Sequence, residues 1–300
     1  MANGRRGMCN HSSFITRLLP LVLCGLFLLF SCNRANQEEP TPYASDTASI
    51  RVALLPTLDC LPLAIAADEG LFDRLGLEVR LIMFHSQMEA EKALTLGHVD
   101  VCASDAWRLA DLRNRGAAVE PLFATRREWA LVATKSLRTQ KLQDVSSRMI
   151  AGTRLSAVDF LADSIETLLS QTNGPMLRPQ INDLRIRQRM LTNAQVDAAL
   201  LPMPIAMQAV QAGGKKLFES GEATRNRTGF IVKSQLLEDS IQSNRLNILR
   251  QAYDSTAVRL SKLPRLPQAP TLDALFHLNG QHGAIEPGKH FAPSTEMQTL

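Results

Sequence analysis

The sequence predicts an α/β protein of two lobes, each built on a doubly wound sheet of parallel strands. Short β-branched or apolar runs alternate with segments whose apolar residues recur at helical spacing, which is typical of such sheets. One stretch is also repeated in outline. Residues 96–107 (LGHVDVCASDAW) and 193–204 (NAQVDAALLPMP) each join a helix end, a V-D-x strand and a loop. Two similar α/β lobes would produce this internal repeat.

The first part of the chain predicts three repeats of a strand, a turn and a helix. Pro62 lies in the first turn of the first helix, where proline is tolerated, and Gly70 ends that helix. Ser86 and Glu89 fit the S-x-x-E capping box that opens the second helix. A third helix ends at Gly116. The strands are predicted at 49–55, 77–84 and 99–103.

Beyond residue 120 the predicted strands are short and separated by turns. They lie at 121–125, 129–134, 148–152, 184–186, 196–201 and 229–233. Ser156 and Asp159 form a second capping box that begins a helix, and helices are also predicted after 186, at 205–214 and at 234–263. Residues 264–300 are rich in Pro, Gly and His, and their weak periodicity predicts no element.

The N-terminus predicts a lipoprotein signal peptide over residues 1–31. Its start is basic without acids, and its apolar run at 18–30 holds about 13 residues, fewer than the roughly 20 that span a membrane. The run ends in Leu29-Phe30-Ser31-Cys32, which resembles a bacterial lipobox. We predict that Cys32 carries a lipid such as palmitate and that polar residues 32–49 form a flexible tether. An ordinary signal peptide or an uncleaved anchor is the alternative.

Charge and cysteine content narrow the class of protein. The chain has 33 basic and 29 acidic residues, and the signal peptide holds three of the basic ones, so 30 and 29 remain. This near-neutral balance argues against nucleic-acid binding. Cys60 and Cys102 either pair or remain small buried residues, and neither lies in a CxxC motif or beside histidines. We therefore expect neither a metal site nor a cofactor.

A family resemblance rests on four stretches. RVALLPTLDCLPLAIAADEGLFDRLGLEVRLIMF resembles the opening of substrate-binding proteins of ABC importers, in the branch that serves thiamine-precursor pyrimidines, sulfonates and nitrate. LTLGHVDVCASDA, LQDVSSRMIAGTRLS and VDAALLPMPIAMQAV extend the resemblance over about residues 50–235, in the expected order. The third stretch has Ser146-Ser147-Arg148 where the family usually has a glycine-lysine pair.

The resemblance implies the two-lobed type II periplasmic-binding-protein fold. Lobe 1 would comprise 50–125 and 226–300, lobe 2 would comprise 126–225, and a hinge of two strands would lie near 125–131 and 225–231. The resemblance further implies a monomer, lipid-anchored in the cell envelope and facing the periplasm or the exterior. It would capture a small polar or anionic molecule and deliver it to a membrane permease.

Ligands of open α/β sheets bind beyond the carboxyl ends of the strands, where helix N-termini offer free N–H groups. Five turns of this sequence occupy such positions. The candidate ligand-binding residues in them are Thr57, Leu58, Asp59, Ser86, Gln87, Ser104, Asp105, Thr153, Arg154, Ser156, Pro202 and Met203. Each has a structural alternative: the serines and aspartates can simply cap helices, and Met203 between two prolines can simply shape its loop.

Beside Arg154, four further residues are weaker candidates: Arg126, Trp107, Trp129 and His85. Arg154 and Arg126 suit an anionic partner, although solvated surface arginines fit equally well. Trp107 or Trp129 could stack on a flat ligand, and His85 could join the cleft, but a structural role is the more common one for each.

Enzymes also use related folds, including menaquinone-pathway dehydratases and a fungal-type pyrimidine synthase. Asp59 or Asp105 could serve such an enzyme as acid or base. The sequence has no GxSxG, no HExxH and no cysteine-rich motif, and the lipobox points to export rather than to the cytosol. We therefore predict a binding protein without catalytic residues. A sensor or adhesion lipoprotein on the same fold remains a third hypothesis.

Overall fold

The computed structural model describes residues 49–138, 141–169, 174–267, 273, 276 and 285–300, which belong to a unit formed by residues 45–300. The predicted signal peptide, Cys32 and the tether up to residue 48 lie outside the described residues. Within the described ranges, no helix combines the length and the apolar composition that crossing a bilayer requires.

The first sheet has five strands, and its centre is fully buried. Their order is β2 (Val79–Met83), β1 (Ile50–Leu54), β3 (Val101–Asp105), β9 (Thr228–Lys233) and β4 (Val119–Thr125). β1 is parallel to β2 and β3, whereas β9 runs antiparallel to both of its neighbours. Every residue of β1 and β3 is buried, as expected for strands covered by helices on both faces.

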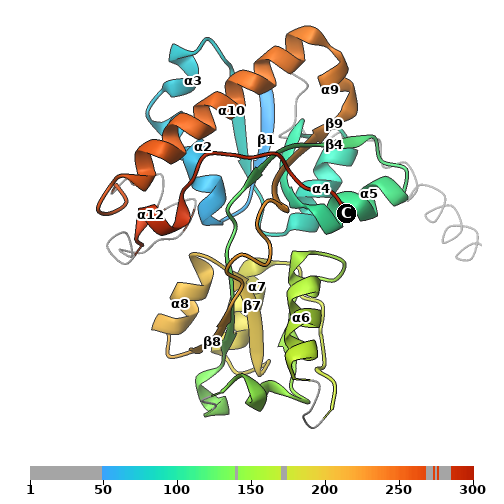
Figure 1. Ribbon diagram of the computed structural model, residues 1–300, viewed down its shortest axis with the longest axis vertical. Coiled ribbons are helices and arrows are strands. Elements are labelled where there is room, and N and C mark those ends of the chain that lie inside the picture. The colour runs from blue at the N-terminus through green and yellow to red at the C-terminus, as the bar shows by residue number, and fades with distance from the viewer. Residues whose placement is uncertain (1–48, 139–140, 170–173, 268–272, 274–275, 277–284) are drawn as a thin grey trace, which may run out of the picture. The chain divides into compact units, whose positions relative to one another are not determined.

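In the described part of the chain, six helices and a C-terminal segment accompany this sheet. The long α10 packs along α2, and α9 precedes it (Figure 1). The predicted helix at 234–263 is interrupted at Asp239, whose carboxylate accepts hydrogen bonds from the first N–H groups of α10. The helices are α2 (Leu61–Asp68), α3 (Leu71–Arg74), α4 (Gln87–Thr95), α5 (Ala106–Asn114), α9 (Ser234–Glu238) and α10 (Ser240–Ser261), followed by α12 (Pro287–His290) in the C-terminal segment.

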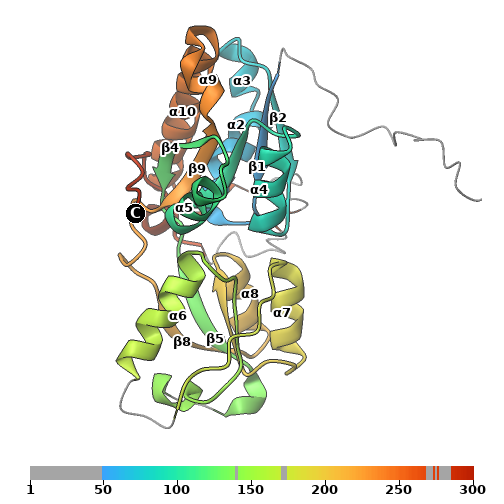
Figure 2. The ribbon, with the colours of Figure 1, turned by 90° about the vertical axis from the view of Figure 1, so that its right-hand side faces the viewer.

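The second sheet has four strands in the order β6 (Ile150–Ala151), β7 (Ala198–Pro202), β5 (Trp129–Ala133) and β8 (Lys215–Glu219). Figure 2 shows α6 on one of its sides and α7 and α8 on the other. These helices span Ala157–Leu168, Leu184–Thr192 and Ile205–Gln211. The described residues also form three short 3-10 helices: η2 (Leu58–Cys60), η3 (Lys135–Leu137) and η4 (Leu142–Val145).

The predicted two-lobed α/β fold is confirmed, with helices on both sides of each sheet. The chain leaves the first sheet through residues 126–128 and returns through 220–227. The parallel direction predicted from alternating strands and helices is found for β1 with β2 and β3 and for β6 with β7, whereas β5 and β9, the strands that follow the two crossovers, run antiparallel to their neighbours.

Two local predictions also fail. The predicted strand at 184–186 is the start of α7, because the Asp183 carboxylate caps it and Leu184, Arg187 and Leu191 form one buried helical face. β8 was not predicted. It is an edge strand whose residues are exposed or half-buried, so it lacks the apolar run that marks a central strand.

Candidate functional site

The turns that follow β1, β2 and β3 meet at one edge of the first sheet, because the carboxyl ends of parallel strands share an edge. They bring together Asp59, Gln87, Ser104 and Asp105, and all four side chains are buried. Gln87 joins the last two turns: its Nε2 donates to Asp105 Oδ2 at 2.8 Å and lies 3.5 Å from Ser104 Oγ. We call these side chains, with Glu91, Arg108 and Arg127, the polar cluster.

Arg127 reaches from the first crossover into this cluster. Its Nη2 lies 3.0 Å from Asp59 Oδ2, and its Nε donates to both carboxylate oxygens at 3.1 Å. Its Nη1 is 3.4 Å from Gln87 Oε1 and from the Ser104 carbonyl oxygen. Burial favours a lower pKa for Arg127, but the nearby negative charges, chiefly Asp59, raise it above the usual value. The guanidinium therefore stays protonated and ties the crossover to three strand ends.

Glu91 of α4 and Arg108 of α5 form the second buried ion pair of the cluster. Arg108 Nε and Nη2 each lie 2.8 Å from Glu91 Oε2, and the Ser104 hydroxyl donates to Glu91 Oε1 at 2.8 Å. Burial raises the pKa of Glu91 above its usual value, although the charge of Arg108 opposes this. Asp111, at the solvent side, contacts Arg108 at 3.1 Å and the exposed Arg115 at 3.0 Å.

Asp105 ends β3 and is the N-cap of α5. Its carboxylate caps α5 by accepting from the Arg108 backbone N–H at 3.0 Å. Burial raises the pKa of Asp105, while hydrogen bonds from Arg108, from Gln87 and from the Ala157 backbone N–H lower it.

In the second lobe, Arg187 donates a hydrogen bond to Thr153 in the turn at 153–156. This guanidinium is fully buried and donates to the carbonyl oxygens of Ile181 at 2.8 Å and Leu200 at 2.9 Å, and to the hydroxyl of Thr153. Burial lowers the pKa of Arg187 to about 10. The group remains charged at neutral pH, with neutral oxygens as its hydrogen-bond acceptors.

The strand ends of the two lobes also touch directly. The Leu58 N–H donates to the Met203 carbonyl oxygen at 3.0 Å, which joins the turn after β1 to the turn after β7. The Leu184 N–H donates to the His85 carbonyl oxygen at 2.8 Å, beside a bridge between Ser86 and Asp183. The structure thus places three of the five predicted turns in direct contact across the lobes: the turn of Leu58 contacts that of Met203, and the turn of Ser86 contacts Asp183.

Several of the predicted ligand-binding residues already form hydrogen bonds with residues nearby in the chain. The Thr57 hydroxyl donates to the Cys60 sulfur at 3.4 Å. Ser86 caps α4, and Ser156 caps α6 by accepting from the Val158 N–H at 3.2 Å. At the second capping box, Asp159 accepts from Leu155 rather than from Ser156, so the reciprocal bond is not the one that the sequence predicts.

The two arginines suggested as anion partners lie at the surface instead. The Arg154 side chain is 50% exposed and pairs with Asp159, and the Arg126 side chain is 40% exposed and pairs with Glu128 and Glu222. Trp129 is buried in the core of the second lobe. Trp107 stacks on Phe160 with ring centroids 4.7 Å apart.

Sequence reasoning missed the buried charges. Arg127 directly follows Arg126, and the sequence alone does not distinguish the buried arginine from the exposed one. Glu91, Arg108 and Arg187 lie within helices, where charged residues usually form a solvated face. The one signal in the sequence is the i, i+4 spacing of Gln87 and Glu91, which favours contact on a helix. In the structure Gln87 Nε2 donates to Glu91 Oε1 at 3.1 Å.

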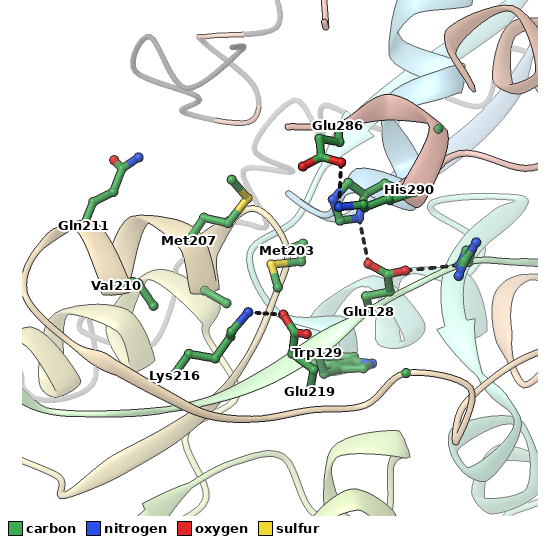
Figure 3. Close-up of a pocket in the computed structure, with 15 residues that line it drawn as sticks. Glu128, Trp129, Met203, Met207, Val210, Gln211, Lys216, Glu219, Glu286 and His290 are labelled. Carbon is green, nitrogen blue, oxygen red and sulfur yellow. Dashed lines mark hydrogen bonds and ion pairs between the residues drawn. The ribbon is translucent and has the colours of Figure 1, made fainter. Parts of the chain in front are cut away.

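A cavity of about 750 Å³ adjoins the loop that holds Met203 (Figure 3). Met203, Met207 and Val210 give it an apolar wall, and α12 borders it. Its charged side chains pair with one another: Lys216 with Glu219 at 2.5 Å, Lys289 with Glu286 at 2.6 Å, and His290 with Glu128 at 2.6 Å.

The two cysteines of the described chain are buried free thiols, which settles the alternative left open by the sequence. Burial raises the pKa of Cys60 to about 12. No group of three or more His, Cys, Asp or Glu side chains within the described ranges could hold a metal ion.

Comparison with known proteins places the fold. Residues 43–118 match the NMT1-like family. A segment of 57 residues is 42% identical to the nitrate import ATP-binding protein NrtC of Synechococcus elongatus, and the match spans 19% of this chain and only 9% of that protein.

Solved structures align over most of both chains. The ligand-binding component of an ABC-type import system from Staphylococcus aureus, solved with zinc bound, aligns at TM-score 0.65 and 12% identity, covering 84% of this chain and 86% of that one. The aliphatic sulphonate binding protein SsuA of Escherichia coli aligns at TM-score 0.62 and 13% identity, covering 82% of this chain and 84% of that one. The nitrate-binding protein NrtA of Synechocystis aligns at TM-score 0.62 and 12% identity, covering 81% of this chain and 69% of that one. The resemblance to the sulfonate and nitrate branch of ABC-importer binding proteins is confirmed: the chain has their two-lobed fold and matches the NMT1-like family over residues 43–118.

Proposed function

We propose that this protein is the solute-binding component of an ABC importer and binds a small molecule between its lobes, at the polar cluster. The observation that carries the proposal is the direct contact between strand ends of opposite lobes, where the Leu58 N–H donates to the Met203 carbonyl oxygen at 3.0 Å. In folds of this kind a ligand lies where such strand ends face each other. The relatives with the same fold include binding proteins for sulfonate and nitrate.

In this proposal lobe 1 comprises 50–125 and 226–300, and lobe 2 comprises 126–225. The crossovers at 126–128 and 220–227 act as the hinge, and the lobes separate to admit the solute and close on it. Arg127 lies in the first crossover and contacts Asp59, Gln87 and Ser104, so a solute at the strand ends would be sensed directly at the hinge. No chemical step is needed, and the protein acts as a carrier rather than an enzyme.

A panel of small solutes tests the binding function. Residues 33–300 would be titrated with sulfonates, nitrate, pyrimidines and amino acids, with melting temperature as the first readout and calorimetry as the second. We expect one class to raise the melting temperature, and Gln87→Ala to weaken its binding by about tenfold or more through the lost hydrogen bonds. Gln235→Ala, at an exposed position on α9, is the control and should bind as wild type does. A panel without any binder, or equal binding by Gln87→Ala, would contradict the proposal.

The membrane attachment is a separate part of the proposal. We infer that Cys32 carries the lipid that holds the protein in the cell envelope beside its permease. Cells fed an alkyne fatty acid should label the wild-type protein and leave Cys32→Ala unlabelled, with the variant released from the membrane fraction. Cys60→Ala, which removes a buried thiol, is the matched control and should stay labelled. Equal labelling of wild type and Cys32→Ala would rule out the anchor.

A further inference from the structure

The C-terminal segment, residues 285–298, is held on lobe 1. Ile285 and Phe291 are buried in a core cluster that includes residues of α10 and of the first sheet. The Ser294 N–H donates to Asp254 Oδ1 of α10 at 2.6 Å, and α12 packs against the same helix. The segment therefore moves with lobe 1 whenever the lobes change position.

This segment reaches the first crossover at Glu128, the residue directly before β5 of lobe 2 (Figure 3). His290 Nδ1 of α12 lies 2.6 Å from Glu128 Oε2, and the two side chains are only 15% and 20% exposed. The Glu128 carbonyl oxygen accepts from the Met203 N–H at 3.0 Å, and the Met203 carbonyl oxygen accepts from the Leu58 N–H at 3.0 Å. Glu128 thus connects α12 with the turn of lobe 2 that touches the end of β1.

The same segment holds the second crossover at Asn226. The backbone of Asn226 has a φ of 59°, a left-handed conformation that asparagine adopts more readily than most residues. Its carbonyl oxygen accepts from the Gln298 N–H at 2.7 Å, and its Oδ1 accepts from the Thr295 hydroxyl at 2.9 Å. The Thr224 hydroxyl donates to the Arg127 carbonyl oxygen at 3.4 Å and joins the two crossovers to each other. Both crossovers are therefore bonded to one segment of lobe 1.

The backbone of the two crossovers rotates when the lobes separate, because these segments join them. Asn226 lies two residues before β9 and stays with lobe 1, whereas Glu128 directly precedes β5 and moves with lobe 2. We propose that the C-terminal segment stabilises the closed arrangement, in which the strand ends touch, in the absence of solute. His290 is the positioning residue and acts on lobe 2 through Glu128. This role rests on the proposed binding function, whose hinge it regulates.

The other ion pair of α12 has a different place. Lys289 pairs with Glu286 inside the C-terminal segment, with side chains 70% and 67% exposed, and such a pair contributes little. Among the ion pairs of the described residues, the pair of His290 with Glu128 is the one that joins the C-terminal segment to lobe 2. Loss of the His290 side chain therefore removes the ion pair between α12 and lobe 2.

The emission of Trp107 reports separation of the lobes without any solute. Its ring belongs to α5 of lobe 1 and stacks on Phe160 of α6 in lobe 2, with centroids 4.7 Å apart. In residues 33–300 carrying Trp129→Phe, we expect His290→Ala to shift the emission to longer wavelength, towards that of Phe160→Ala. The radius of gyration from small-angle X-ray scattering should rise in the same variant, and this readout does not depend on the ring stack.

Three further variants assign the effect to this contact. Glu128→Ala removes the partner and should produce the same two changes. His290→Asn keeps a nitrogen at the place of Nδ1 and should retain the wild-type emission and radius. Glu296→Ala, at an exposed position of the same segment, is the control and should also match wild type. Only variants that unfold cooperatively in urea are compared. An unchanged emission and radius in His290→Ala or Glu128→Ala, or an equal change in His290→Asn or Glu296→Ala, would overturn the proposal.

Solute binding distinguishes this role from the carrier function. Loss of the His290 contact lowers the fraction of free protein in the closed arrangement, so a solute of the panel should bind His290→Ala about threefold or more weakly, and Glu296→Ala as it binds wild type. Equal affinity of His290→Ala and wild type would overturn the role of His290. A panel without a binder would contradict the carrier function alone, because emission and scattering are measured without solute.

Discussion

The guanidinium of Arg127 lies 3.0 Å from the carboxylate of Asp59, and this buried salt bridge joins the crossover between the lobes to the end of β1. The Thr125 hydroxyl donates to the same carboxylate at 2.8 Å. Thr125 at the end of β4 and Arg127 in the first crossover are thus both bonded to one aspartate of lobe 1.

Removing one member of this pair should destabilise the protein strongly. Asp59→Asn leaves Arg127 buried without its counter-charge, and we expect the free energy of unfolding to fall by about 3 kcal/mol or more. Urea denaturation of residues 33–300 measures this. Lys216→Met breaks an exposed pair with Glu219 and should cost at most about 1 kcal/mol. Equal costs at the two sites would contradict the structural role assigned to the buried pair.

The stack of Trp107 on Phe160 should report lobe separation by fluorescence. The chain has two tryptophans, so Trp129→Phe isolates the signal of Trp107. In that background Phe160→Ala should shift the emission to longer wavelength, because the indole loses an aromatic neighbour at 4.7 Å and gains solvent. Leu168→Ala, on the exposed side of the same helix, should leave the emission in place. An unchanged spectrum in Phe160→Ala would show that the two rings do not stack in solution.

Gly229 should not tolerate a side chain. It pairs with Ser104 on one side and Ala124 on the other, and an added Cβ would lie 2.2 Å from the Phe123 carbonyl oxygen and 2.7 Å from Ala124 Cα. Gly229→Ala should therefore lower the free energy of unfolding by about 3 kcal/mol or more, since two strands must move apart. Gly76→Ala, where φ is also positive but the space is open, should cost only about 1 kcal/mol. Thermal denaturation of the two variants compares them.

The Asp100 carboxylate should stabilise the folded protein near neutral pH and lose this effect in acid. Burial favours a higher pKa for Asp100, but hydrogen bonds and charge from Arg51 hold the pKa below its usual 3.8. A depressed carboxyl pKa stabilises the folded state fully above the unfolded value, and this stabilisation disappears as pH falls through the folded value. The stability difference between wild type and Asp100→Asn should therefore be constant near neutrality and shrink below pH 3.8. Urea titrations across this range check it, and a constant difference would contradict the assignment.

Sequence patterns located most of the fold because the central strands are apolar runs and the helices have clear ends. The capping serines and Gly70 illustrate this. The patterns did not identify elements that are exposed or too short to show an apolar periodicity. β8 is a charged edge strand, and three residues beginning at Leu184 are too few to distinguish strand from helix. The reversed direction of β9 depends on the return from lobe 2, which no local pattern encodes.

The same logic predicted which strand ends carry the candidate residues, but it did not predict the chemistry of the polar cluster. Strand ends are visible in a sequence, and those predicted do meet, as Leu58 and Met203 show. The buried charges cannot be recognised in the sequence, because burial of Arg187 or Glu91 depends on which face of its helix packs against the sheet of its own lobe. Arg126 and Arg127 are adjacent and have the same side chain, yet only packing places one in solvent and the other against Asp59.

The C-terminal segment protects the open edge of the first sheet. β4 is the last strand in its order, and Thr295 covers it through two backbone hydrogen bonds with Ala124, at 2.8 and 3.1 Å. Met297 is buried in the adjacent core, and the Gln298 N–H donates to the Asn226 carbonyl oxygen at 2.7 Å. An uncovered edge strand is a template for pairing with other chains. A chain shortened before residue 295 would thus expose a self-association surface, and affinity tags for purification are better placed ahead of residue 49 than in place of this segment.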